Sequence, residues 1–208
     1  MTRVILASAS PARLQLLKNA GIFADVKVSG VNEELSEFLE LPPIQMVVAL
    51  AKAKALAVAS SLKGDQLIIG ADSTLEFEGK NVGKPATSDE AFSLWSSYRN
   101  KSGILYTGQV VIDLSNGAIA ERVSATKITF ADVSDEEIDA YIKTGEPLQV
   151  AGGATLDGIG SPFISRIEGD ATGVIGLSMP DLFEMVTSLG HSWYKLRQIG
   201  SEIGRAHV

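Results

Sequence analysis

Near its N-terminus the chain reads Val4-Ile5-Leu6-Ala7-Ser8-Ala9-Ser10-Pro11-Ala12-Arg13, and this stretch decides the class of fold. The apolar run at 4–7 predicts a short strand. Ser10 is a good N-cap, and Pro11 suits the first position of the helix that follows. Because a strand turns directly into a helix, we expect an α/β protein.

The alternation of strand and helix continues outward from this stretch. The Asn116-Gly117 turn joins two long strand patterns into a hairpin. The expected elements are strands at 23–28 and 66–71, a long Ala-rich helix at 43–62, and hairpin strands at 106–114 and 118–130. The strand at 66–71 is expected to stop at Asp72, and residues 73–77 are expected to continue into a hairpin around Gly79. A hairpin among strand–helix units predicts a mixed sheet rather than a purely parallel one.

The second half of the chain contains two capping boxes, Thr87 with Glu90 and Ser134 with Glu137, and each predicts the start of a helix. The later elements are expected as strands at 163–167 and 174–177 and as a helix at 180–189. The length of 208 residues fits one domain of two closely packed lobes at 1–190, followed by a C-terminal tail at 191–208.

The composition argues against several classes of protein. A net charge of −7 disfavours nucleic-acid binding, which relies on Lys and Arg to neutralise phosphates. The chain has no cysteine, and its two histidines, His191 and His207, lie near the C-terminal end. Thiolate nucleophiles, Ser-His-Asp triads and zinc sites are therefore not expected. A metal would take oxygen ligands, which points to magnesium or manganese.

No stretch of the sequence is long and apolar enough to span a membrane, and the N-terminal residues show no signal-peptide pattern. We therefore expect a cytoplasmic protein with no membrane partner and no nucleic-acid partner.

Three residues of the opening stretch suit a phosphate group. Ser8, Ser10 and Arg13 bring two hydroxyl groups and a guanidinium to a helix N-terminus, whose free N–H groups attract anions. The alternative is an ordinary helix cap beside a surface arginine, and the stretch alone leaves both interpretations open.

Acidic residues follow two of the predicted strands. Asp72 comes directly after the apolar run at 67–71, and Glu33 and Glu34 follow the strand at 23–28. Carboxylates at neighbouring strand ends of an α/β protein can share a divalent cation and activate a water. A plain turn after each strand is the alternative.

Lysines and glycines supply the remaining candidates. The motif Gly83-Lys84-Pro85 is not a P-loop, because its spacing and its proline depart from that motif, but its lysine still offers a fixed positive charge. Lys52 and Lys54 lie two apart on the long helix, so at most one of them is expected to face the site. The Gly-rich stretch at 152–160 indicates a tight loop near the ligand or a pair of bulges.

Taken in order, the short motifs of this chain resemble the Maf family of nucleotide pyrophosphatases, in the form of an actinobacterial branch. The motifs are Ser8-Ala9-Ser10-Pro11-Ala12-Arg13, Val31-Asn32-Glu33-Glu34, Leu50-Ala51-Lys52-Ala53-Lys54-Ala55, Gly70-Ala71-Asp72-Ser73, Gly83-Lys84-Pro85, Tyr106-Thr107-Gly108, Glu146-Pro147-Leu148, Ala151-Gly152-Gly153 and Val174-Ile175-Gly176-Leu177. The resemblance runs from Val4 to about Gly190. It implies a Maf-like fold related to the inosine-triphosphatase-like fold: a mixed twisted sheet flanked by helices, with a central cleft between two lobes.

The resemblance also implies roles for individual residues. The proton-accepting aspartate of the family falls on Asp72 and its acidic partner on Glu33, the pair expected to hold magnesium or manganese. The residues assigned to substrate binding are Ser8, Ser10, Arg13, Lys54, Lys84, Thr107 and Asp157. The chain departs from the family at Ala12, Ser73 and Asp157, where arginine, threonine and glutamine are usual. These differences bear on base specificity and phosphate affinity.

The implied activity is hydrolysis of nucleoside triphosphates, ribose or deoxyribose, to monophosphate and pyrophosphate by water that attacks the α-phosphorus. Expected substrates are pyrimidine nucleotides such as dTTP and UTP, or modified nucleotides, cleared as house-cleaning of the nucleotide pool. The family also implies a link to cell division arrest and a homodimer. Two alternatives stay open: a pyrophosphatase for modified purines such as 7-methyl-GTP, and a nucleotide-binding regulator of cell division without turnover.

Overall fold

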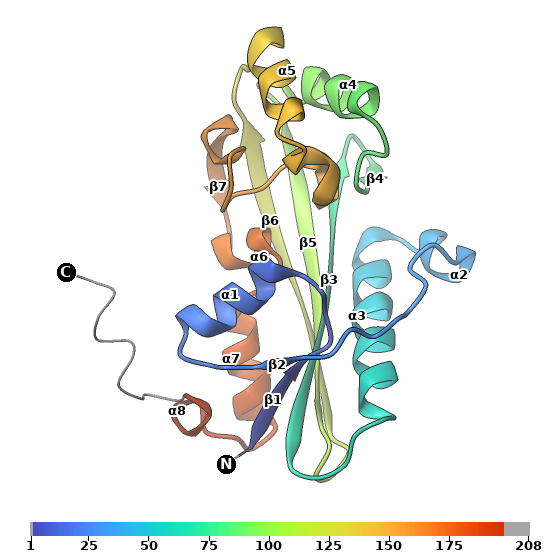
Figure 1. Cartoon of the computed structure of the whole chain (residues 1–208), viewed down its shortest axis with the longest axis vertical. Coiled ribbons are helices and arrows are strands. Elements are labelled where there is room, and N and C mark those ends of the chain that lie inside the picture. The colour runs from blue at the N-terminus through green and yellow to red at the C-terminus, as the bar shows by residue number, and fades with distance from the viewer. Residues whose placement is uncertain (1, 198–208) are drawn as a thin grey trace, which may run out of the picture.

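Helices cover both faces of one long sheet in the computed structural model, which describes residues 2–197 (Figure 1). The strands are β1 (Arg3–Leu6), β2 (Asp25–Val26), β3 (Gln66–Phe77), β4 (Lys80–Val82), β5 (Ser102–Asp113), β6 (Ile119–Phe130) and β7 (Ile164–Glu168). The α-helices are α1 (Pro11–Asn19), α2 (Ser36–Leu39), α3 (Pro43–Ala59), α4 (Ser88–Tyr98), α5 (Asp135–Lys143), α6 (Ala171–Ile175), α7 (Met179–Ser188) and α8 (Trp193–Leu196). Short 3-10 helices lie between α5 and β7: η1 (Glu146–Gln149), η2 (Ala151–Gly153) and η3 (Ser161–Phe163).

The sheet formed by the described residues has seven strands in the order β2-β1-β3-β5-β6-β7, with β4 paired to β3. β1 runs parallel to both β2 and β3. β3, β5, β6 and β7 are antiparallel neighbours, and the predicted turn at Asn116-Gly117 closes the hairpin between β5 and β6. The predicted mixed sheet of an α/β protein is therefore confirmed.

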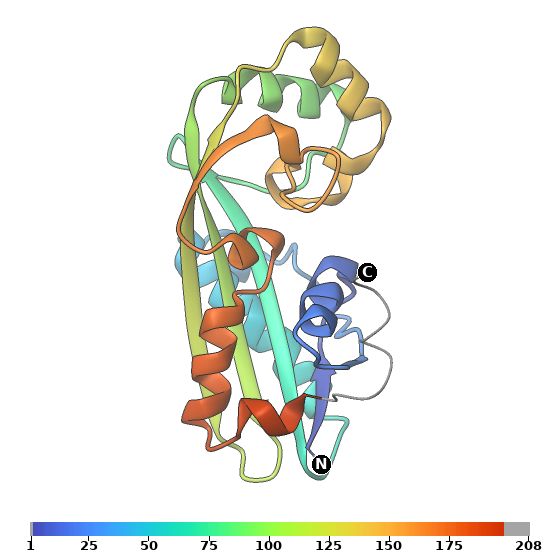
Figure 2. The same ribbon diagram turned by 90° about the vertical axis from the view of Figure 1, so that its left-hand side faces the viewer.

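Two lobes share the long strands β3, β5 and β6, which run from one end of the molecule to the other (Figures 1 and 2). In the lower lobe, α3 covers one face of the sheet, and α1 and α7 pack together on the other. The upper lobe contains α4, α5 and the 3-10 helices, packed around an aromatic cluster that includes Trp95, Tyr98 and Phe130. Each lobe thus has its own hydrophobic core, in agreement with the predicted two-lobed arrangement.

Two glycines let α3 lie directly on the sheet. A Cβ atom at Gly70 would overlap the carbonyl oxygen of Ala51, and one at Gly108 would overlap the backbone at Val47. Glycine inside a strand commonly marks such a close approach of another backbone. The small side chains of α3 complete the fit, since Ala51 and Ala55 are fully buried. This close packing brings the side chains of α3 within reach of β3.

The prediction that a strand stops at Asp72 is wrong, because β3 continues without interruption to Phe77. The hairpin predicted around Gly79 is confirmed, since β4 pairs antiparallel with the end of β3. The polar residues after position 71 alternate with buried apolar ones, a pattern that suits a continued strand. Asp72 nevertheless lies at an opening in the sheet. β1 pairs with β3 only as far as Ile69, and β4 begins its pairing at Leu75, so between these points no described strand borders that edge of β3.

The strand predicted at 174–177 is also wrong, because these residues belong mainly to the helix α6 and its C-terminal turn. Asp170 caps this helix by accepting hydrogen bonds from the backbone N–H groups of Thr172 and Gly173. A short apolar run cannot be assigned to strand or helix from periodicity alone, and here the cap decides.

The first residues of the predicted C-terminal tail pack onto the lower lobe. Leu196 of α8 is buried in the same cluster as Leu17 and Met185. His191 Nε2 lies 2.8 Å from Oδ2 of Asp113, a residue at the end of β5. The rest of the tail, 198–208, lies outside the described residues. No helix in the described part of the chain is long and apolar enough to cross a membrane.

Candidate active site

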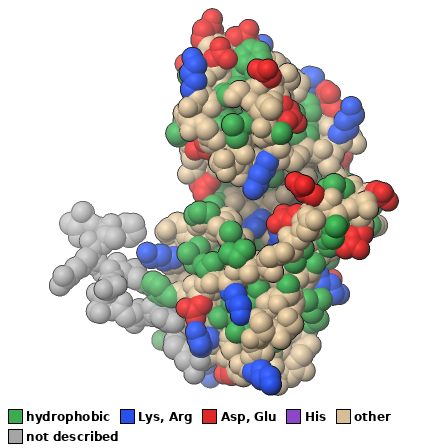
Figure 3. All heavy atoms as spheres, turned by 45° about the vertical axis from the view of Figure 1, so that its right-hand side comes forward, with side chains coloured by type: hydrophobic (Ala, Val, Ile, Leu, Met, Phe, Trp, Pro, Cys, Tyr) green, Lys and Arg blue, Asp and Glu red, His purple; other side chains and the backbone are tan. Residues whose placement is uncertain are grey.

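A hollow lies between the two lobes, and side chains of both charges gather on its walls (Figure 3). The elements that carry the candidate residues of the lower lobe meet at this level of the molecule (Figure 1). Ser8 and Ser10 lie between β1 and α1, Glu33 follows β2, Lys54 lies on α3, and Asp72 lies in the middle of β3. At Asp72, no described strand borders this edge of β3.

Lys54 joins the two acidic candidates. Its Nζ lies 2.8 Å from Oε1 of Glu33 and 2.7 Å from Oδ1 of Asp72. Lys54 is 6% exposed and Asp72 is 8% exposed, and a buried ammonium needs such partners because an unpaired buried charge is strongly disfavoured. Lys52 instead pairs with Glu121, so the prediction that the two lysines face different sides is confirmed.

Burial raises the pKa of Asp72 above its ordinary value, although the charges of Lys54 and Arg13 oppose the rise. Within the described chain, its side chain makes one hydrogen bond, through Oδ1 to Lys54, so Oδ2 is available to a water or a ligand. A buried carboxylate with a raised pKa and a free oxygen is well suited to accept a proton near neutral pH.

Arg13 connects the start of α1 to the C-terminal end of α6. Its Nη1 donates to Oγ of Ser8 at 3.0 Å, and its Nε donates to the carbonyl oxygen of Gly176 at 2.7 Å. Burial lowers the pKa of Arg13 while the charges of Asp72 and Glu33 raise it, and a guanidinium stays protonated under any of these influences. Ser10 accepts from the backbone N–H of Arg13, which confirms its predicted role as the cap of α1.

Ser73, which was not among the predicted site residues, accepts a hydrogen bond through its hydroxyl oxygen from Nη2 of Arg13 at 3.2 Å. Ser73 Oγ also lies 2.8 Å from Oγ1 of Thr107, which in turn donates to the carbonyl oxygen of Gly173. Because a hydroxyl has one proton, Ser73 must donate to Thr107, and it keeps only acceptor capacity for Arg13. Thr107 is fully buried, so its predicted direct contact with a substrate gains no support from this placement.

The upper lobe carries the two remaining candidates, Lys84 and Asp157, and both are exposed. The carbonyl oxygen of Gly83 accepts from the N–H of Gly152 at 2.8 Å, so the lysine loop is held against the turn of η2. In the loop after η2, Asp157 accepts a hydrogen bond from the hydroxyl group of Thr155. No contact among the described residues joins Lys84 or Asp157 to Asp72. The structure therefore assembles the candidate residues of the lower lobe and leaves these two apart from them, on the upper lobe.

The carboxylates of the lower lobe suit a metal that arrives with its ligand. Within the described chain, no group of three or more acidic or histidine side chains is arranged to hold an ion. Glu33 and Asp72 offer two carboxylates, and magnesium commonly binds through one or two carboxylates plus substrate phosphates. The residues thus fit a metal–phosphate complex rather than a metal cage made of protein alone.

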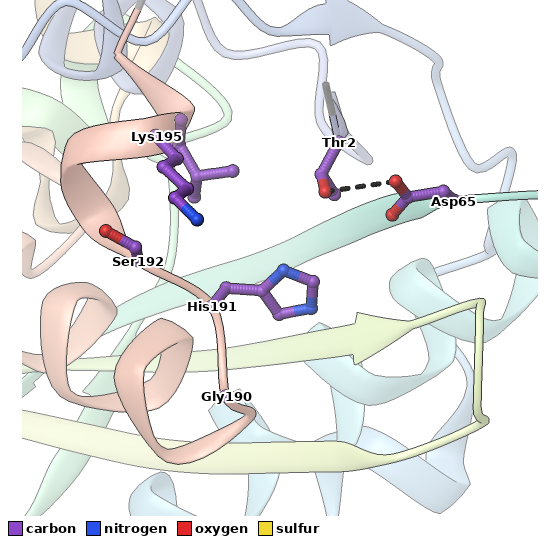
Figure 4. A pocket seen from close by; sticks show the side chains of 7 residues that line it. Thr2, Asp65, Gly190, His191, Ser192 and Lys195 are labelled. Atoms are coloured by element: carbon purple, nitrogen blue, oxygen red, sulfur yellow. Dashed lines mark hydrogen bonds between the residues drawn. The ribbon is translucent and has the colours of Figure 1, made fainter.

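A separate pocket of about 290 Å³ lies at the other end of the lower lobe (Figure 4). His191 and Lys195 line it on one side, with Thr2 and Asp65 opposite them. It contains none of the candidate residues, and the hollow between the lobes remains the place where they gather.

Residues 3–189 match the protein family described as Maf-like protein. The chain belongs to the Maf-like family. The match extends from β1 to the residue after α7, so every candidate residue lies within the Maf-like unit.

Relatives of high similarity carry the name nucleoside triphosphate pyrophosphatase. The protein from Salinispora tropica is 47% identical over 191 residues, which cover 90% of this chain and 84% of that protein. The protein from Streptomyces coelicolor is 45% identical, covering 90% and 91%, and the one from Mycobacterium marinum is 42% identical, covering 92% and 95%. These Maf-like relatives confirm the resemblance to the actinobacterial branch.

Proposed function

We propose that this protein hydrolyses nucleoside triphosphates to nucleoside monophosphate and pyrophosphate. The observation that carries the proposal is the buried ion pair of Lys54 and Asp72 at the opening of the sheet, which the exposed Glu33 joins from outside, with Arg13 beside it. The chain shares 42–47% identity with proteins named for this activity. A carboxylate with one free oxygen, surrounded by fixed cations, provides a base and a binding site for an oxyanion in one place.

In the proposed mechanism, Oδ2 of Asp72 accepts the proton of a water that attacks the α-phosphorus. Arg13 and Lys54 neutralise phosphate oxygens from the lower lobe, and Lys84 does so from the upper lobe, so pyrophosphate leaves with its charge compensated. Ser8 and Ser10, at the N-terminus of α1, hold one phosphate group in register. Thr107 contributes by fixing Ser73, and through it Arg13.

A divalent cation, magnesium or manganese, would bind to Glu33 and Asp72 and to phosphate oxygens, and would supply further neutralisation of the triphosphate charge. Because the protein offers only two carboxylates, most of the remaining ligands would come from the substrate and water. We therefore expect the nucleotide and the metal to bind together.

The preferred substrates in this proposal are pyrimidine nucleotides such as dTTP and UTP, or modified nucleotides, and the reaction clears them from the nucleotide pool. The resemblance to the family supports this assignment, together with a cytoplasmic homodimer and a link to cell division arrest. Asp157, where the family usually has glutamine, is the candidate on the upper lobe for contact with the base.

The test is chromatography of the products after incubation with a panel of nucleotides and magnesium or manganese. The panel contains the common ribose and deoxyribose triphosphates and 7-methyl-GTP, and a chelator provides the control. The proposal predicts monophosphate and pyrophosphate, both lost with the chelator, and the fastest substrate identifies the base. Diphosphate with orthophosphate would refute it, and binding without turnover would favour a regulator that holds the nucleotide.

A further inference from the structure

The ammonium group of Lys54 lies at the point where the two carboxylates of the site converge. It is 2.8 Å from Oε1 of Glu33 and 2.7 Å from Oδ1 of Asp72, so one cation already bridges the pair. The proposed function assigns the same two carboxylates to a divalent metal. A lysine ammonium and a metal ion cannot both occupy the space between them, because like charges at such short range repel strongly.

The packing of α3 on the sheet keeps the side chain of Lys54 in this position. The backbone of α3 lies against Gly70 and Gly108, so the stem of Lys54 starts from a helix packed tightly on the sheet. Its side chain is only 7% exposed, and the residues buried with it on α3 are apolar. If Lys54 leaves the carboxylates, it needs another anion within reach of its flexible stem. A phosphate group of the substrate is an anion of that kind.

We propose that Lys54 competes with the divalent metal for Glu33 and Asp72, and that it moves to a phosphate of the substrate when the metal takes these carboxylates. The inference rests on the proposed function, because it uses the metal and the triphosphate of that reaction. Lys54 then takes the place of the metal in the free protein: its ammonium compensates the two carboxylates until metal and nucleotide arrive together. Metal alone therefore binds weakly, since it must leave a buried ammonium without a partner.

The test measures Mn²⁺ binding without nucleotide, by electron paramagnetic resonance of the free ion, for the wild type, Lys54→Met and Lys52→Met. Lys52 is the matched control, because it lies on the same helix but pairs with Glu121. Lys54→Met is expected to bind Mn²⁺ about tenfold or more tightly than the wild type, which corresponds to removal of a modest competing interaction. Lys52→Met is expected to bind as the wild type does.

A thermal measurement supplies a second readout. Without metal, Lys54→Met is expected to unfold at a lower temperature than the wild type, because the two carboxylates then lose the cation that bridges them. Mn²⁺ should raise its unfolding temperature more than it raises that of the wild type. The milder substitution Lys54→Gln serves if Lys54→Met does not fold, and adding Glu33→Gln to either variant should abolish the gain in Mn²⁺ affinity.

The inference is overturned if the folded Lys54 variants bind Mn²⁺ no more tightly than the wild type. That result leaves the proposed function standing as long as the wild type releases pyrophosphate from a triphosphate. Conversely, tight Mn²⁺ binding by Lys54→Met supports the competition even if product analysis were to reveal a different reaction.

Discussion

The lower lobe buries charged side chains, whereas the upper lobe buries aromatic ones whose polar atoms bond to the backbone. In the lower lobe, Lys54 and Asp72 are almost completely buried and hold each other at 2.7 Å. In the upper lobe, Trp95 Nε1 donates to the carbonyl oxygen of Gly153 and Tyr98 Oη to that of Gly152. These buried groups are paired in both lobes, but the pair in the lower lobe consists of two opposite charges, each of which can take another charged partner.

This difference indicates that the lower lobe contributes mainly to catalysis and the aromatic cluster of the upper lobe mainly to stability. Buried charges are a poor way to stabilise a fold, so their presence points to chemistry. The aromatic rings around Trp95 pack edge to face and fix the turn of η2, which in turn holds Gly83 and the lysine loop. We therefore expect substitutions in the lower cluster to reduce turnover and substitutions in the aromatic cluster to reduce stability.

The largest effect is expected for Asp72→Asn, which removes the proton acceptor but keeps the shape of the side chain. We expect kcat to fall about 10³-fold, within the range for loss of a general base. Steady-state kinetics with the preferred nucleotide measures the loss, and circular dichroism checks the fold. Glu34→Gln is the matched control: Glu34 is exposed beside Glu33 and lies outside the cluster, so its kcat should stay near the wild-type value.

The aromatic cluster is tested by Trp95→Phe. The substitution leaves the carbonyl oxygen of Gly153 without its donor and removes part of a fully buried ring. We expect the free energy of unfolding to fall by about 1–3 kcal/mol, as measured by urea denaturation, with kcat changed by no more than a few-fold. Loss of turnover at unchanged stability would contradict the division between the lobes.

Lys84→Ala tests whether the upper lobe contributes a charge to the site. Since Lys84 is exposed, we expect stability to change by less than about 0.5 kcal/mol. Loss of a charged contact to phosphate should raise KM about tenfold. Lys80→Ala, at an exposed position of β4, is the control. Equal KM values for the two variants would place the substrate entirely on the lower lobe.

The smallest effect concerns Asp113, a buried carboxylate of the lower lobe that lies outside the hollow. Burial would raise its pKa, but hydrogen bonds from Ser115 and His191 outweigh burial and hold the pKa below its usual range. The folded-state pKa is thus below the unfolded value of about 3.9, so the carboxylate stabilises the fold above that pH and loses this contribution as pH falls.

Asp113→Asn should therefore lower the free energy of unfolding by about 1 kcal/mol at neutral pH. The difference from the wild type should shrink as the pH falls through the folded-state pKa of Asp113. Urea denaturation at both ends of this range measures the effect, and kcat should stay unchanged. A loss that persists undiminished in acid would remove Asp113 as its source.

Local signals in the sequence predicted the elements that carry the site. Ser10 caps α1 as expected, the capping boxes start α4 and α5, and the spacing of Lys52 and Lys54 separates their partners. Each of these features depends on residues only a few positions apart, where propensity and periodicity are informative.

The parts that the sequence did not predict depend on contacts between distant residues. Asp72 was expected at the end of its strand, but β3 continues past it. The opening beside Asp72 arises because β1 pairs with β3 only as far as Ile69 and β4 begins its pairing at Leu75. Ser73 gains its role from Arg13 and Thr107, on two other elements. Gly70 and Gly108 were the available signals for the close approach of α3, since glycine inside an apolar strand often marks such a contact.

The central claim is that water activated by Asp72 attacks the α-phosphorus. Hydrolysis of the preferred triphosphate in ¹⁸O-labelled water, followed by mass spectrometry of both products, tests it directly. The account predicts that one labelled oxygen appears in the nucleoside monophosphate and none in the pyrophosphate. Label in the pyrophosphate would place the attack on the β-phosphorus and contradict the assignment of the base.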